Sequence, residues 1–127
     1  MATARSVDEL LVYRKALQAA KDVSGVLKRP LLQRDFRLRD QLGSSSERVA
    51  SLIAEGFELS TDRHFAEYCY RARGSSREVR TQLEIAAARG YVTESECLAF
   101  ATRYEEIARM LTGLIRHLER EQRRNRR

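Results

Sequence analysis

The chain has 127 residues, of which 43% are hydrophobic and 33% charged, and its formal net charge is +6. This length suits one domain that buries roughly two-thirds of its unfolded surface, so a core does not need metal or disulfide staples. No apolar run approaches the ~20 residues that cross a bilayer and no signal peptide opens the sequence, which predicts a cytoplasmic protein without a membrane role.

Apolar residues at three- and four-residue steps predict four helices. After a frayed start at residues 1–7, the first helix is expected from about residue 8 to residue 27. Pro30 ends it, because proline lacks an amide hydrogen and disfavours a helical residue before it. The predicted core positions of this helix are Leu10, Tyr13, Leu17, Ala20, Val23 or Ser24, and Leu27.

The second helix is expected from about Asp35 to Gly56, where a glycine in the left-handed conformation would close it. Its middle is Gly43-Ser44-Ser45-Ser46, which is poor helix material because glycine costs about 1 kcal/mol relative to alanine. Two interpretations stay open: a continuous helix, or a break followed by a restart on a capping box of Ser44 and Glu47. The predicted core positions are Leu38, Leu42, Val49, Leu52 and Ile53.

The third and fourth helices have clearer ends. Ser60 and Thr61 can cap the third helix, which is expected over residues 62–89 and ends at Gly90. Thr93 and Glu96 form a capping box that starts the fourth helix. The predicted core positions are Phe65, Tyr68, Ala72, Val79, Leu83 and Ala86 on the third helix, and Phe100, Tyr104, Ile107, Leu111, Leu114 and Leu118 on the fourth.

Four helices joined by short connections predict an all-α fold, an antiparallel up-down-up-down four-helix bundle. We expect a single domain over residues 1–127, with an arginine-rich C-terminal tail at residues 119–127. No linker, charge block or internal repeat divides the chain.

Three short segments carry a resemblance: IAEGF at residues 53–57, ARGSSREVRTQL at residues 72–83 and GYV at residues 90–92. Over nearly the whole chain, the sequence resembles a bacterial four-helix-bundle family, the 23S ribosomal RNA intervening-sequence proteins. More distantly it is similar to the accessory variability proteins of diversity-generating retroelements. The resemblance favours a continuous second helix and implies a homopentamer with a basic surface, no catalytic motif, and a reverse transcriptase as a candidate partner.

Small residues occur in both middle helices. If these helices are antiparallel about a turn near Leu59, Gly43 falls opposite Gly74 and Ser75, and Ser46 falls opposite Ala72. One interpretation is a close approach of the two backbones. The other is a hydroxyl-lined notch at a subunit interface or for a ligand, although hydroxyls without an activating base are no nucleophile site.

Arginines form a stripe on the fourth helix. At about 100° per residue, five arginines spaced by seven, four, three and four residues fall within roughly 60° of one another. They are Arg109, Arg116, Arg120, Arg123 and Arg127. The stripe runs beyond Leu118, the last core residue, which favours contact with the phosphates of a nucleic acid. A shorter row lies on the third helix, where Glu78 and Glu84 could neutralise it. The predicted nucleic-acid-binding residues are Arg109, Arg116, Arg120, Arg123, Arg124, Arg126 and Arg127, with Arg73, Arg77 and Arg80 from the shorter row.

Motifs for catalysis and cofactors are not found. Di-iron bundles need Glu-x-x-His, but Thr61 precedes His64 and Leu114 precedes His117 at that spacing. There is no Walker loop, Rossmann glycine pattern, CxxC pair or HExxH. Cys69 and Cys97 are interpreted as small packing side chains. We therefore predict no enzymatic activity, no catalytic or metal-binding residues and no cofactor.

Extra small or apolar residues widen the third and fourth helices beyond one seam, which is consistent with self-association. They are Cys69, Ser76, Ala87, Ala88, Ala101, Ala108 and Ile115. The sequence thus predicts a non-enzymatic homo-oligomer that binds nucleic acid, with RNA favoured, through backbone charge. The alternative is a structural or scaffolding oligomer without a nucleic-acid ligand, in which arginines pair only with glutamates.

Overall fold

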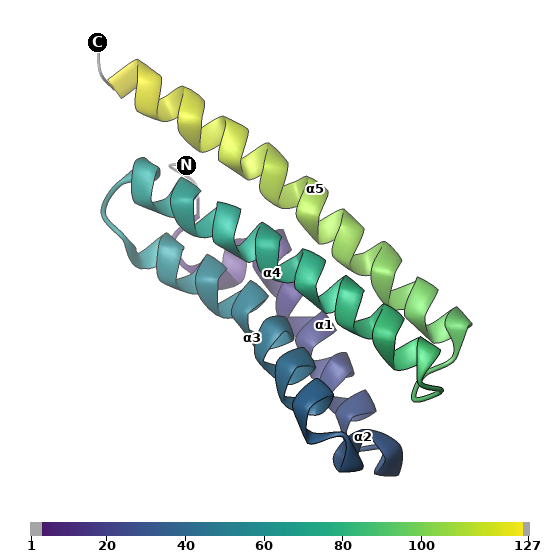
Figure 1. Ribbon diagram of the computed structural model, residues 1–127. Helices are drawn as coiled ribbons and strands as arrows, with labels where there is room; N and C mark the ends of the chain where they lie inside the picture. Colours follow the sequence, from purple (N-terminus) through teal and green to yellow (C-terminus); the bar gives the residue numbers. More distant parts are fainter. Residues whose placement is uncertain (1–3, 126–127) are drawn as a thin grey trace.

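The computed structural model of the protein describes residues 4–125, which contain helices and no strand (Figure 1). The prediction of an all-α fold in one compact unit with four long helices is confirmed. In chain order the elements are η1 (Val7–Glu9), α1 (Leu11–Leu27), α2 (Pro30–Arg34), α3 (Phe36–Glu58), α4 (Asp62–Ala88) and α5 (Glu94–Asn125).

Each long helix packs against two others. Helix α3 lies on α4, α4 lies on α5, and α1 packs against both α3 and α5, as Figure 1 shows. Between α4 and α5, Tyr70 reaches Glu119 whereas Arg80 reaches Glu105, so contacts run in opposite order along the two helices. Short α2 closes one end of the bundle by burying Leu32 completely.

The core agrees with the apolar pattern on α3, where all five predicted positions are buried. On α1 the buried centre is rotated toward Ala16, Ala19 and Val23, which are fully buried. The larger Tyr13 and Leu17 lie on its flanks and are half-buried. The rotation has a packing reason, since small side chains at a helix contact allow a shorter distance between helix axes.

Helix α3 is continuous through the glycine-serine segment, so the alternative of a break is wrong. Ser46 donates its hydroxyl to the carbonyl oxygen of Gly43 at 3.0 Å. Asp35 caps the helix by accepting from the amide of Leu38 at 3.3 Å. Serine side chains that bond back to the preceding turn are compatible with a helix interior.

The predicted role of Gly56 as a left-handed helix end is also wrong. Gly56 lies inside α3, and among residues 4–125 only Gly90 has a positive φ. A Cβ at Gly56 would lie 2.7 Å from Cβ of Tyr68 and 2.9 Å from Cδ1 of Phe65. Glycine is therefore required here because α3 and α4 approach each other closely.

The first helix ends at Leu27 as predicted, but it begins at Leu11 and not near residue 8, and Pro30 opens the short helix α2. The predicted ends around α4 and α5 are confirmed. Thr61 accepts from the amide of His64 at 3.2 Å, which caps α4. Gly90, with φ +77°, ends α4 in a Schellman motif, in which the amide of Tyr91 donates to the carbonyl oxygen of Ala86 at 2.9 Å. The capping box at α5 is reciprocal, because Thr93 N donates to Glu96 at 2.9 Å and Glu96 N donates to Thr93 at 3.0 Å.

The two chain ends differ from the expectation. Of the predicted frayed start at residues 1–7, residues 4–7 are described, and Val7 begins the turn η1 (Val7–Glu9) and packs on the core. The predicted tail is a regular continuation of α5 through Asn125. No helix between residues 4 and 125 combines the length and apolar character that crossing a membrane requires.

Candidate nucleic-acid interface

The outer face of α5 carries the predicted arginine stripe. Four members of the stripe lie within the described residues, and all four are exposed and form no ion pair with a carboxylate of residues 4–125: Arg109, Arg116, Arg120 and Arg123. Arg124 is exposed too and lies 3.1 Å from Glu121. Arg126 and Arg127 lie outside the described residues. The structure therefore places four guanidinium groups on one solvated helical face.

The carboxylate one turn before Arg109 is already occupied. Glu106, one turn before Arg109, binds Nζ of Lys15 on α1 at 2.8 Å. This bond lowers the pKa of Glu106, and Arg109 adds a smaller electrostatic contribution in the same direction. The carboxylate of Glu106 is thus paired with Lys15 of α1, and the guanidinium of Arg109 is available to bind another group.

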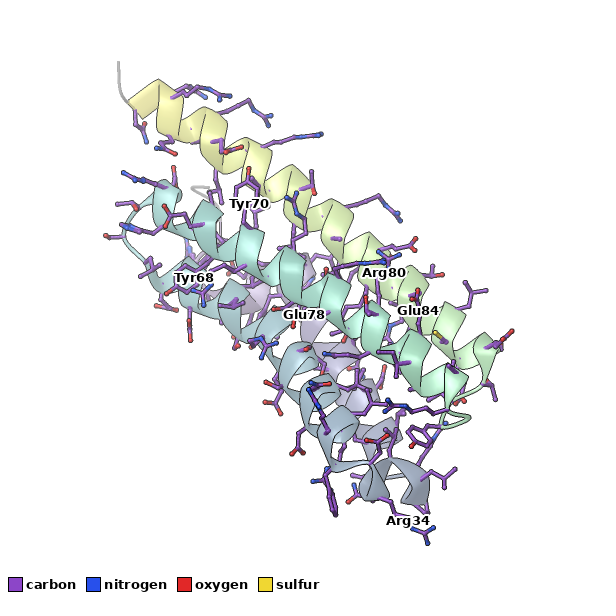
Figure 2. The ribbon with its side chains drawn as sticks, viewed as in Figure 1. Arg34, Tyr68, Tyr70, Glu78, Arg80 and Glu84 are labelled. Atoms are coloured by element: carbon purple, nitrogen blue, oxygen red, sulfur yellow. The ribbon has the colours of Figure 1, made fainter. Side chains whose placement is uncertain are left out.

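Beyond Leu118, the inner side of α5 is not free. Tyr70 on α4 donates its hydroxyl to Glu119 on α5 at 3.3 Å. Figure 2 shows Tyr70 between these two helices. Further along, Gln122 and Asn125 line a hollow together with residues 60–63 of the α3–α4 corner. As far as Asn125 the predicted tail is thus helical, so Arg120 and Arg123 project from a helix and not from a loose arm.

The three arginines of the shorter row on α4 differ in their surroundings. Arg80 donates to Glu105 on α5 at 2.9 Å, and Arg73 donates to Thr112 at 2.9 Å with its guanidinium 5.0 Å from the ring centroid of Tyr70. Figure 2 shows Arg80 extending toward α5. Arg77 alone among the three is exposed. Two of these predicted phosphate contacts therefore already join α4 to α5.

The predicted neutralising partners of that row are also corrected. Glu78 lies 3.3 Å from Arg48 on α3, and the carboxylate that binds Arg80 comes from α5. Sequence proximity suggested Glu78, but its neighbour in space is set by the packing of α3 against α4. Ion pairs also join α1 to α5, where Arg103 lies 2.8 Å from Asp22.

The facing patches of small residues are not formed as predicted. A Cβ on Gly43 would meet Leu27 of α1 at 3.2 Å, whereas Gly74 is exposed with open space beside it. The prediction paired residues of α3 and α4 that are equally distant from Leu59, which would place Ser45 opposite Arg73. Instead Ser45 lines a hollow together with Gln82, so α4 is displaced along α3 relative to that pairing. Ser75 is buried, which agrees with the close-contact interpretation at that position.

A polar cluster at the α2 end of the bundle was missed. Asp35 Oδ2 accepts from Tyr91 Oη and from Arg89 Nη1, both at 2.8 Å. The bond from Tyr91, followed by those from Leu38 and Arg89, lowers the pKa of Asp35, and the same contact raises the pKa of Tyr91. This cluster ties the start of α3 to the α4–α5 connection.

A second ion pair extends the cluster. Arg29 binds Glu96 through two bonds, one of them from Nη1 to Oε1 at 3.0 Å, and donates to the carbonyl oxygen of Tyr91 at 3.2 Å. The bond from Arg29, helped by the amide of Thr93, lowers the pKa of Glu96 to about 2. The capping box identified Glu96 from sequence, but no periodic signal indicates its partner, 67 residues away.

Other reactive groups are packed into the bundle. Burial raises the pKa of the Cys69 thiol to about 12, so this thiol is protonated at neutral pH and is a packing side chain, as predicted. Burial also raises the pKa of Cys97. Across residues 4–125, His, Cys, Asp and Glu do not gather in groups of three that could hold a metal ion.

Part of the predicted self-association surface lies inside the bundle and is not available to another subunit. Cys69, Ser76 and Ile115 are buried inside the bundle, because the core of α4 and α5 is wider than one seam. Near the α4–α5 connection a shallow apolar hollow remains, and Leu98 on its wall is 68% exposed. The residues that line this hollow are Glu84, Ala87, Ala88, Glu94, Cys97, Leu98 and Ala101.

Comparisons with known proteins agree with this geometry. A solved structure from Bacteroides thetaiotaomicron VPI-5482, described as a protein with unknown function from the S23 ribosomal protein family, superposes with a TM-score of 0.77 over 84% of this chain and 96% of that chain. At 20% identity, this likeness shows a shared fold. None of the curated proteins matches the chain. The sequence profile described as 23S rRNA-intervening sequence protein matches residues 8–113, and the chain therefore belongs to that family.

Proposed function

We propose that this protein is a non-enzymatic RNA-binding protein that holds the phosphate backbone on the outer face of α5. The observation that carries the proposal is the set of four exposed arginines on that face without a carboxylate partner among residues 4–125. Other arginines of the bundle, such as Arg48, Arg80 and Arg103, pair with carboxylates of facing helices. The family description supports RNA as the nucleic acid.

Arginine suits this role because its planar guanidinium presents a fork of donors that binds phosphate through two bonds. The spacing of the face is regular, and Arg109 and Arg123 are separated by about 21 Å at 1.5 Å per residue. Contacts of this kind carry no base information, so we expect affinity that depends on charge and salt more than on sequence.

The test compares two triple variants that remove the same positive charge. One replaces Arg116, Arg120 and Arg123 with Gln, and its control replaces Arg14, Lys21 and Lys28 with Gln, which are exposed on α1 or at its C-terminal end. Binding of a labelled single-stranded RNA is measured by fluorescence anisotropy at several salt concentrations. The salt slope is about −0.7 per phosphate contact for single strands, so the α5 variant should flatten it by about 2 while the control leaves it close to that of the parent protein.

Equal losses in both variants would show that net charge, and not the α5 face, accounts for binding. Negligible RNA binding by the parent protein at low salt would overturn the proposal entirely. Arg127 belongs to the same predicted stripe and Arg126 is a predicted binding residue beside it, and removing residues 122–127 extends the test to both. Arg77 is a further exposed candidate on α4.

Assembly is part of the proposal. We expect the four long helices to follow the up-down-up-down order, which the opposite order of the α4–α5 contacts supports. We expect a cytoplasmic homo-oligomer, a pentamer by resemblance, with the apolar hollow around Leu98 as a subunit contact. A reverse transcriptase is a candidate partner by resemblance to the retroelement proteins.

The second candidate is a scaffolding oligomer without a nucleic-acid ligand. It is favoured by the ion pairs between facing helices, in which Lys15, Arg48 and Arg103 bind carboxylates at 2.8–3.3 Å. Each such surface pair contributes only about 0–1 kcal/mol to the free energy of unfolding. These pairs therefore favour particular alignments of facing helices more than they stabilise the fold. The RNA titration described above separates the two candidates.

A further inference from the structure

An exposed aromatic ring lies at the end of the bundle away from the C-terminus of α5. Phe36, the first residue of α3, keeps 65% of its surface exposed, whereas Leu32 and Leu38 on either side of it in the chain are buried. An apolar ring of this size does not gain stability for the fold while it faces water. The ring is therefore free to contact a partner outside the bundle core.

The position of the ring is fixed by its neighbours. Asp35, which precedes it, caps α3 and is held by Arg89 and Tyr91 at 2.8 Å. The guanidinium of Arg39 lies 5.0 Å from the ring centroid of Phe36 and donates to the carbonyl oxygen of Gln33 at 3.3 Å. The guanidinium of Arg39 thus covers one face of the ring, and the rest of the ring is exposed to solvent.

The charge around the ring is positive. Arg34 and Arg37 flank it in the chain, are exposed, and form no ion pair with a carboxylate of residues 4–125. The two nearby carboxylates are already occupied, since Asp35 binds Arg89 and Asp40 lies 3.1 Å from Arg39. Figure 2 places Arg34 at the α2 tip of the molecule, where it points outward.

We infer that Phe36 is a stacking platform for an unpaired base of single-stranded RNA, with Arg34 and Arg37 binding the phosphates beside that base. An exposed aromatic ring with unpaired arginines close to it in the chain has the chemistry of single-strand recognition, because every base offers a π-face and every nucleotide a phosphate. The inference rests on the proposed RNA binding and adds a base contact to the backbone contacts of α5.

A second copy of the chain is the competing occupant. Phe36 and the half-exposed Leu31 could both insert into an apolar surface of another subunit. The two unpaired arginines argue against this, because covering them with protein would remove their hydration without supplying a counter-charge. A polyanion supplies that charge, so RNA is favoured over a protein surface.

The experiment uses the full chain and two RNA probes of about 12 nucleotides, a length within known single-strand site sizes. One probe is oligoadenylate, and the other is an abasic strand of the same length and charge. Phe36→Leu keeps an apolar side chain but removes the aromatic face, while Phe36→Trp retains it. Because Phe36 is mostly exposed, neither substitution removes a packed core contact.

Phe36→Leu is expected to weaken oligoadenylate binding by about 5- to 150-fold, which corresponds to the energy of one stacked base. It should leave binding of the abasic strand unchanged, and Phe36→Trp should bind both probes like the parent protein. An unchanged ratio of the two affinities in Phe36→Leu overturns the stacking site while leaving the α5 proposal intact. A changed oligomeric state by light scattering, with RNA affinity unaffected, overturns it in favour of a subunit contact. If the parent protein binds neither probe at low salt, the proposed function fails and this inference fails with it.

Discussion

The contact between α3 and α4 at Gly56 gives a sharp test of the packing. Alanine there would bring its Cβ to 2.7 Å from Cβ of Tyr68, whereas carbon atoms pack best at about 3.5–4.0 Å. Because Cβ of Tyr68 moves only with its backbone, the two helices must separate by about 1 Å. Overpacking of this kind costs typically about 1–3 kcal/mol, against about 1 kcal/mol that alanine gains over glycine in a helix.

Gly74 and Gly113 provide matched controls. Both lie inside helices, and an added Cβ would meet nothing within 4 Å, so alanine at either position should stabilise by about 1 kcal/mol. We expect Gly56→Ala to be about 1–3 kcal/mol less stable than Gly113→Ala, or about 0.5–1.5 M lower in the urea midpoint at a slope near 2 kcal/mol/M. Equal stabilisation by all three substitutions would refute the close approach of α3 and α4.

Three further predictions concern other parts of the molecule. The pKa of Glu96 falls from the ordinary 4.5 to about 2, so the stability it contributes is complete above pH 4.5 and is lost as the pH falls toward 2; Glu96→Gln should remove this part of the acid sensitivity in urea titrations at a series of pH values. The hydroxyl of Tyr104 is buried without a partner among the described residues, so Tyr104→Phe should raise the free energy of unfolding by about 1–3 kcal/mol, and a lower melting temperature would contradict this. Leu98→Ser should weaken self-association in sedimentation experiments, whereas Ala99→Ser, on an exposed neighbour, should not.

Local signals in the sequence were sufficient for most helix ends. A cap such as Thr61 or Thr93 acts on amides within three residues, and Gly90 acts on the turn that it closes. The buried face of α3 was equally readable, because its apolar residues follow a single stripe. These features depend on the chain within a few turns, where periodicity and side-chain chemistry determine the outcome.

Contacts between helices were not predictable in the same way. The partner of Arg80 is Glu105 and the partner of Asp35 is Tyr91, and both pairs depend on how far one helix is displaced along another. A displacement of one turn, about 5.4 Å, replaces every facing residue by one four positions away. The same displacement explains why Gly56 serves a contact with Tyr68 and not a helix end.

The positions of the two proposed RNA surfaces set the length of strand that could join them. Phe36 begins α3, and the corner after α3 shares a hollow with Gln122 and Asn125 at the end of α5. Helix α3 has 23 residues, and at 1.5 Å per residue Phe36 and the Arg123 end of the α5 face are separated by about 34 Å. A single strand that rises 3.4 Å per nucleotide needs about ten nucleotides to cover this distance. Shorter strands cannot reach from Phe36 to the Arg123 end of α5, whereas longer strands bring that contact to a high effective concentration. An affinity that rises abruptly near this length would therefore place both surfaces on one path, and a smooth rise would make them independent sites.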